Sequence, residues 1–156
     1  MKFSRCKALV LAAVILLADQ VVKQIVAFNL DEGGGFVVIA GLFDIRYVRN
    51  PGAAWGMFAG HRWPLIAAAF AALGVFVFYA ERMFGHLKAG WVTLALLTGG
   101  IVGNLIDRAV YGYVIDYLDF YWGRSHFPAF NVADSAICIG AGLMILTQWL
   151  YDRRKH

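Results

Sequence analysis

The chain has 156 residues, of which 61% are hydrophobic and only 15% are charged, and its mean hydropathy is +0.65. This composition lies outside the range of soluble globular domains and predicts an integral membrane protein of one domain, residues 1–156. The net charge of +4 comes from short basic clusters at the ends of apolar runs. No basic face interleaved with aromatic residues occurs, so no nucleic-acid partner is expected.

The first apolar run follows three cations and resembles the start of a signal peptide. It continues too far for such a peptide and lacks a small-residue cleavage site, so we expect an uncleaved spanning helix over about residues 8–28. Such a helix is about 30 Å long, enough to cross the hydrocarbon core. Asp19 and Lys23 share one face of it at i, i+4 spacing. They either form an ion pair that makes the helix tolerable in lipid or help to position an active site.

Residues 29–62 do not continue the pattern of a spanning helix. Short β-branched and aromatic runs on either side of Gly41 predict a hairpin. Asn50, Pro51 and Gly52 then predict a turn. A freely exposed hairpin would leave many large apolar groups in water, so we expect a small β-sheet that lies on the outer membrane surface.

Three further apolar runs predict helices over about residues 64–80, 91–110 and 132–150, with a loop over 111–131. The expected fold is therefore a mainly α-helical membrane protein with four transmembrane helices. Eight of the fourteen cations and only two of the ten acids then lie on the side of the termini. By the positive-inside rule, both termini are cytoplasmic, and the β-rich segment and the loop lie outside.

Residues 99–135 carry most of the polar groups that lie between apolar runs. Asp116 and Asp134 are eighteen residues apart, on either side of a loop that can fold back on itself. Two facing carboxylates that share one proton supply a base and an acid for activating water against an amide. Because polar groups at membrane depth are expensive, we interpret this stretch as the functional site.

Spacing alone leaves several alternatives open. Asp119 would share a face with Asp116 if that segment were helical. Asn131 and Asp134 have the spacing of a capping box, which is a purely structural role. Arg108 beside Asp107 fits a plain interfacial charge pair.

Gly99 and Gly103 have the small-xxx-small spacing that allows another helix to approach closely.

Other kinds of site are disfavoured. The four histidines are scattered and no Cys-x-x-Cys motif occurs, so no metal and no cofactor are expected. No nucleophile motif of the Gly-x-Ser-x-Gly kind is present. The rival functions are a small proton-coupled transporter that uses the same carboxylates as a relay, and an assembly subunit with buried ion pairs only. Few polar groups lie deeper than Asp19, which disfavours a pathway through the membrane.

Five blocks of the sequence together resemble the lipoprotein signal peptidases, the type II signal peptidases of bacteria. The blocks are D-Q-V-V-K at 19–23, N-P-G-A-A-W-G at 50–56, G-N-L-I-D-R at 103–108, V-I-D-Y at 114–117 and F-N-V-A-D-S at 130–135. Five ordered blocks over nearly the whole chain are a specific signal.

The resemblance implies a multi-pass aspartic endopeptidase of the bacterial inner membrane, with its active site near the outer face. Its substrates would be diacylglyceryl-modified prolipoproteins, cut on the N-terminal side of the lipidated cysteine, and the peptide antibiotic globomycin would inhibit it. Membrane lipid would surround what we expect to be a monomer. The resemblance also implies that Asp116 and Asp134 are catalytic. The residues that would support them or contact substrate are Asp19, Lys23, Asn50, Gly52, Gly103, Asn104, Arg108, Asn131 and Ala133.

The two carboxylates differ in their predicted surroundings. Asp134 lies in the first turn of a helix, where free backbone N–H groups and the helix dipole favour a negative charge. Asp116 lies in a connecting segment without that support. We therefore predict that the shared proton resides mainly on Asp116.

Overall fold

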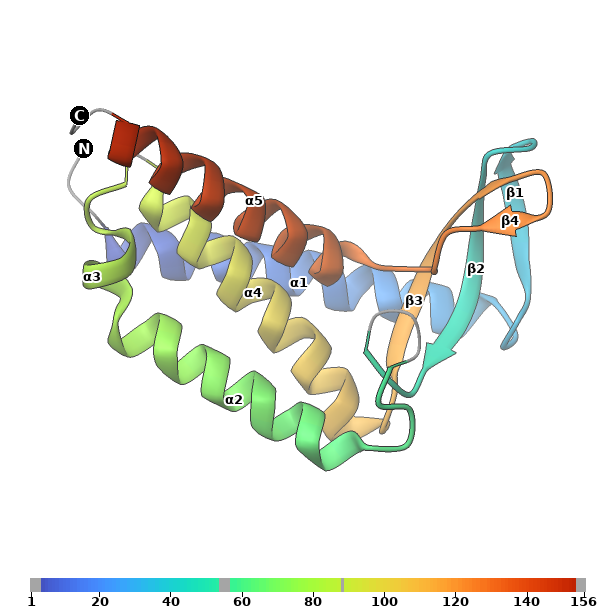
Figure 1. The fold of residues 1–156 in the computed structure, drawn as a ribbon. Coiled ribbons are helices and arrows are strands. Elements are labelled where there is room, and N and C mark those ends of the chain that lie inside the picture. The colour runs from blue at the N-terminus through green and yellow to red at the C-terminus, as the bar shows by residue number, and fades with distance from the viewer. Residues whose placement is uncertain (1–3, 54–56, 88, 154–156) are drawn as a thin grey trace.

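The computed structural model describes residues 4–53, 57–87 and 89–153. Five helices and four strands follow one another along these residues (Figure 1). They are α1 (Arg5–Asn29), β1 (Gly35–Ile39), β2 (Phe43–Asn50), α2 (Arg62–Phe78), α3 (Ala80–Phe84), α4 (Gly90–Val110), β3 (Val114–Trp122), β4 (Ser125–His126) and α5 (Val132–Arg153).

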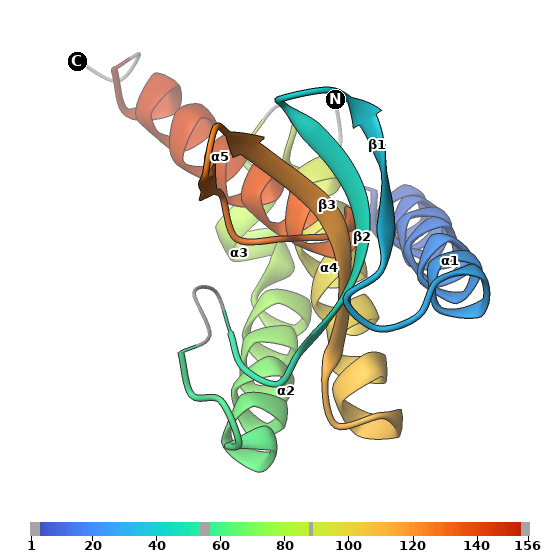
Figure 2. The same ribbon diagram turned by 90° about the vertical axis from the view of Figure 1, so that its right-hand side faces the viewer.

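The long helices form a bundle, and the sheet lies at the end of the bundle that is remote from both termini (Figures 1 and 2). Helix α4 packs against α1, α2 and α5. Two glycines permit the close contact with α1: a Cβ on Gly103 would lie 2.6 Å from Asp19 Oδ2, and one on Gly99 would lie 2.9 Å from the Ala12 carbonyl oxygen. The predicted close-approach motif is thus confirmed.

Three helices in the described part of the chain are long and apolar enough to cross a membrane, namely α1, α4 and α5. Helix α2, predicted over 64–80, spans 17 residues and ends at Phe78, where a separate short helix follows. The expectation of four transmembrane helices is therefore not confirmed by length and composition.

The sheet is larger than the predicted hairpin. Strands β1 and β2 pair antiparallel across a turn in which Gly41 has φ +78°, as predicted. Residues 111–131, however, are not simply a loop, because β3 pairs antiparallel with β2 and with β4. The run V-I-D-Y-L-D-F-Y-W has the β-branched and aromatic content of a strand, which its two aspartates obscured.

Candidate active site

Strand β3 and the first turn of α5 bring Asp116 and Asp134 to one cleft of about 980 Å³. The chain between them leaves along β3 and returns beside it, so that Phe130 forms a bridge with Leu118. Asp116 therefore lies in a strand, and neither the helix nor the loop considered from the sequence is correct. We call Asp116 and Asp134 the carboxylate pair.

Amide groups surround the carboxylate pair. Asp116 accepts hydrogen bonds from the side-chain amides of Asn131, at 2.7 Å, and Asn50, at 3.0 Å. Asp134 accepts from the Asn104 side chain at 2.7 Å and from the Asn131 backbone N–H at 3.2 Å. In the described chain, no Lys or Arg lies within ion-pairing distance of either carboxylate.

Asn131 joins the two carboxylates. Its side-chain amide donates to Asp116 while its backbone N–H donates to Asp134. Its side-chain oxygen accepts the Asp134 backbone N–H at 2.8 Å, which completes the predicted capping box at the start of α5. The structural and the functional interpretations of this motif are therefore compatible, because one asparagine caps the helix and contacts both acids.

Burial raises the pKa of Asp116 to about 7, and the neighbouring Asp134 carboxylate adds to the effect by repulsion. The hydrogen bonds from Asn50 and Asn131 act in the opposite direction, because they favour the ionised form. Asp116 has no helix N-terminus to stabilise its charge, as predicted, although two side-chain amides donate to it. Desolvation nevertheless outweighs them, so Asp116 can hold a proton near neutral pH.

A second polar group, the Lys23 cluster, lies between α1 and α4 and consists of Lys23, Asp19, Asp107 and Asn104. Lys23 Nζ lies 2.8 Å from Asp19 Oδ2, 2.9 Å from Asp107 Oδ2 and 2.9 Å from Asn104 Oδ1. The three charged side chains are completely buried. The predicted Asp19–Lys23 ion pair is thus confirmed, and the Asp107 carboxylate joins it.

The Lys23 cluster is connected to the carboxylate pair through the backbone. Asp107 Oδ2 accepts the N–H of Ile115 at 3.1 Å, and Asp19 Oδ1 accepts the N–H of Ala133 at 2.9 Å. Ile115 and Ala133 each directly precede one member of the carboxylate pair. One buried lysine therefore orients, through two carboxylates, both segments that carry the acids.

Arg108 and the 50–52 turn close the site on the side of β2. The Arg108 guanidinium donates to the Gly52 carbonyl at 2.9 Å and to the Asn104 carbonyl at 3.3 Å. Asn50 Oδ1 accepts the Gly52 N–H at 3.0 Å. Asn50 thus holds the turn with its oxygen while its nitrogen contacts Asp116, and Arg108 lines the cleft.

Ten of the eleven site residues predicted from the sequence fall into two groups, and the other, Gly52, lies in the 50–52 turn and instead bonds to Asn50 and Arg108. Some line the cleft or contact the carboxylate pair, whereas Asp19, Lys23, Gly103 and Ala133 form the packed frame behind it. Asp107 was not among the site residues predicted from the sequence. Its position three residues after Asn104, on the same side of α4, was the signal that could have identified it.

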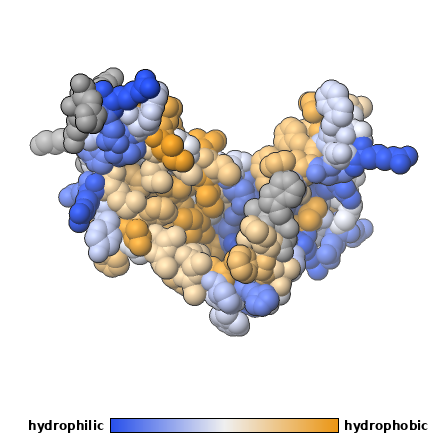
Figure 3. Space-filling view, in the orientation of Figure 1, coloured by the Kyte–Doolittle hydropathy of each residue, from blue (hydrophilic) through white to orange (hydrophobic). Residues whose placement is uncertain are grey.

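The cleft runs from the helices to the sheet. Ile137 and Cys138 of α5 line one end, and Arg46, His126 and Phe127 line the other, with the carboxylate pair between them. Figure 3 shows a hollow between the apolar surface of the helices and the sheet. A peptide bound in this cleft would pass the two carboxylates on its way from the bundle to the sheet.

Comparisons with known proteins agree with this arrangement. A model of the signal peptidase (SPase) II family matches residues 11–150. The chain belongs to the signal peptidase II family. The lipoprotein signal peptidase of Vibrio cholerae is 40% identical over 151 residues, which cover 94% of this chain and 88% of the relative. The lipoprotein signal peptidase of Syntrophotalea carbinolica is 39% identical over 153 residues, which cover 96% of this chain and 95% of the relative.

Solved structures agree as well. A bacterial membrane enzyme determined at 2.3 Å by the in meso method has a TM-score of 0.92 and 31% identity, covering 99% of this chain and 94% of its own. A second bacterial membrane enzyme, determined at 1.9 Å by the same method, has a TM-score of 0.83 and 33% identity. The match covers 93% of this chain and 94% of that enzyme's chain. This signal peptidase II family member is therefore a bacterial membrane aspartic endopeptidase, and the transporter interpretation finds no support.

Proposed function

We propose that Asp116 and Asp134 are the catalytic pair with which this enzyme cuts diacylglyceryl prolipoproteins before the lipidated cysteine. The observation that carries this proposal is the convergence of the two carboxylates on one cleft, joined by Asn131 and free of ion pairs within the described residues. A nearby cation would favour the ionised form of both acids. Neutral amides leave one proton for the pair to share.

In the proposed mechanism the ionised Asp134 removes a proton from water as the water oxygen attacks the scissile carbonyl carbon. The protonated Asp116 donates its proton to the carbonyl oxygen, which gives a tetrahedral diol. Breakdown of the diol breaks the C–N bond while Asp134 returns its proton to the leaving nitrogen. Asp116 recovers a proton from a diol hydroxyl as the new carboxyl group forms.

We further propose that α2 crosses the bilayer as a fourth spanning helix. At about 1.5 Å per residue, 17 residues cover roughly 26 Å, slightly less than a typical hydrocarbon core. The exposed side chains of α2 include Phe70, Val75 and Val77, which suit contact with lipid. The carboxylate pair then lies near the outer membrane face, with both termini in the cytoplasm.

Cysteine labelling tests this orientation. In a background with Cys6→Ala and Cys138→Ala, Asp31→Cys and Ser125→Cys should react with an impermeant thiol reagent in spheroplasts. Arg153→Cys should react only after the membrane is opened. The reverse labelling pattern would overturn the orientation without affecting the proposed chemistry.

A cleavage assay with the purified protein tests the function. The enzyme should cut a diacylglyceryl prolipoprotein at the bond before the modified cysteine and should leave the unmodified precursor intact. Globomycin, which we propose binds in the same cleft, should block the reaction. Asp134→Asn is the matched inactive control, and cleavage by that variant at the wild-type rate would refute the mechanism. We also expect the protein to elute as a monomer in detergent.

A further inference from the structure

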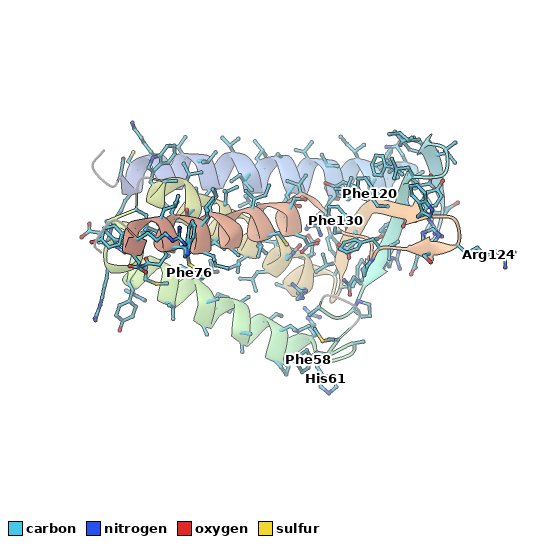
Figure 4. All side chains as sticks on the ribbon, turned by 45° about the horizontal axis from the view of Figure 1, so that its top comes forward. Phe58, His61, Phe76, Phe120, Arg124 and Phe130 are labelled. Atoms are coloured by element: carbon cyan, nitrogen blue, oxygen red, sulfur yellow. The ribbon has the colours of Figure 1, made fainter. Side chains whose placement is uncertain are left out.

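The return segment between the two carboxylates contains a polar contact that the proposed mechanism does not use. After β3 the chain turns and comes back through β4 to residues 127–130, which line the cleft at its sheet end. We call residues 127–130 the cleft wall. Figure 4 shows Arg124 at the tip of this turn, pointing outward, and Phe120 and Phe130 close together at its base.

The cleft wall is attached to β3 at both ends. At the inner end, Phe130 exchanges backbone hydrogen bonds with Leu118 at 2.8 and 3.1 Å, and its ring stacks on Phe120. At the outer end, the Phe127 N–H donates to the Phe120 carbonyl at 2.8 Å. Beside it, His126 Nδ1 lies 2.9 and 3.0 Å from the two carboxylate oxygens of Asp119.

Asp119 is suited to hold the outer end because its carboxylate is almost completely buried and is fixed from two sides. Only 5% of its side chain is exposed, and it accepts from Arg46 of β2 at 3.3 Å as well as from His126. A carboxylate only accepts hydrogen bonds, so His126 Nδ1 carries the proton. Asp44 lies directly opposite on β2, and like charges at paired positions repel, so Asp119 needs both partners.

The direction in which a substrate peptide would run through the cleft suggests what the cleft wall binds. A signal peptide spans the membrane beside the helices, so it enters the cleft at the α5 end and its downstream residues leave at the sheet end. Given the proposed function, on which this inference rests, we propose that the Asp119–His126 contact positions the cleft wall as the binding surface for the first residues after the lipidated cysteine. Asp119 and His126 are therefore positioning residues that determine affinity for extended substrates.

Substrate length separates this role from a general effect on folding. One lipidated peptide ends directly after the modified cysteine, and a second continues for about six more residues, or roughly 20 Å of extended chain. His126→Ala should lower kcat/KM for the long peptide about tenfold, mainly through KM, as expected for the loss of a hydrogen bond to a charged group. The short peptide should be cut as well as by the wild type.

Three further variants complete the test. His126→Asn places an amide N–H near the Nδ1 position and should restore most of the affinity for the long peptide. Asp119→Ala should reproduce the defect of His126→Ala. His86→Ala removes a histidine that contacts Gln148 at 2.9 Å on the opposite end of the molecule, and should change neither peptide's kinetics.

If His126→Ala lost kcat/KM equally on both peptides and had a lower melting temperature, the Asp119–His126 contact would serve only to stabilise the fold. That result would overturn the proposal. Unchanged kinetics on the long peptide in His126→Ala would overturn it too. A wild-type enzyme that cuts neither peptide would instead count against the proposed function.

Discussion

The Lys23 cluster is buried, and in the carboxylate pair Asp116 is buried and Asp134 half-buried, but the two groups differ in how their charges are balanced. In the cluster, one ammonium lies within 2.9 Å of two carboxylates. The Ala133 backbone N–H satisfies Asp19 Oδ1, and the Gln20 side-chain amide satisfies Asp107 Oδ1. In the pair, the hydrogen-bond partners that the described residues supply to the two carboxylates are all amides. The first arrangement pairs opposite charges, whereas the second places two acids side by side with no cation bonded to either within the described residues.

This difference explains why adjacent polar groups have separate tasks. A buried charge is tolerated when it is paired, and removing one partner of such a pair is strongly destabilising. The Lys23 cluster thus supplies a rigid frame. The carboxylate pair keeps a pKa near neutrality at Asp116 because burial and the neighbouring Asp134 carboxylate disfavour its ionised form.

The largest expected effect comes from removing either member of the pair. Asp116→Asn and Asp134→Asn should each lower kcat by about a thousandfold or more, and the double variant should be little worse, because the two act as a unit. Both should keep the wild-type melting temperature to within a few degrees. Substantial turnover by either single variant, measured with the lipidated prolipoprotein, would remove the aspartic mechanism.

The next largest effect should follow from Lys23→Met, which leaves two buried carboxylates without their cation. We expect a loss of about 3–5 kcal/mol in the free energy of unfolding, together with a fall in kcat, because both backbone anchors loosen. Thermal unfolding in detergent and kcat measured on the soluble fraction separate the two effects. A variant with normal stability and normal kcat would show that the cluster is not the frame.

A smaller effect is expected for Asp107→Asn. The amide side chain of this variant has the shape of the aspartate and keeps one acceptor oxygen. It carries no charge, however, so its contact with Lys23 and its hydrogen bond from the Ile115 N–H are weaker. We expect kcat to fall about tenfold, in line with the loss of a charge-assisted hydrogen bond. Asp152→Asn, at the other end of the molecule, is the control, and an Asp107→Asn loss as large as that of Asp116→Asn would place Asp107 in the chemistry itself.

The smallest expected change is a shift in pH dependence. If protonated Asp116 is the acid, kcat/KM should fall as the pH rises through its pKa of about 7. Asn50→Ala removes a hydrogen bond that favours the ionised form, so the alkaline limb should move to higher pH by about half a unit. A shift to lower pH would contradict the assigned protonation state.

Much of this site could be predicted from the sequence because its strongest signals are local. Polar residues between apolar runs mark functional positions in a membrane protein, and the Asn131–Asp134 spacing belongs to a helix cap. The i, i+4 spacing of Asp19 and Lys23 likewise predicts their contact. These patterns depend on a helix or a turn, whose geometry relates residues a few positions apart.

The membrane character, the β1–β2 hairpin and, through the five blocks, the family could be inferred without the structure. The folded chain was needed to see that Asp116 lies in a strand, that Asp107 shares Lys23 with Asp19, and that Asp119 contacts His126 of the return segment. The physical reason is that these contacts join elements far apart in the chain. Strand pairing and helix packing set their partners, and no local periodicity records which carboxylate meets a cation and which meets an amide.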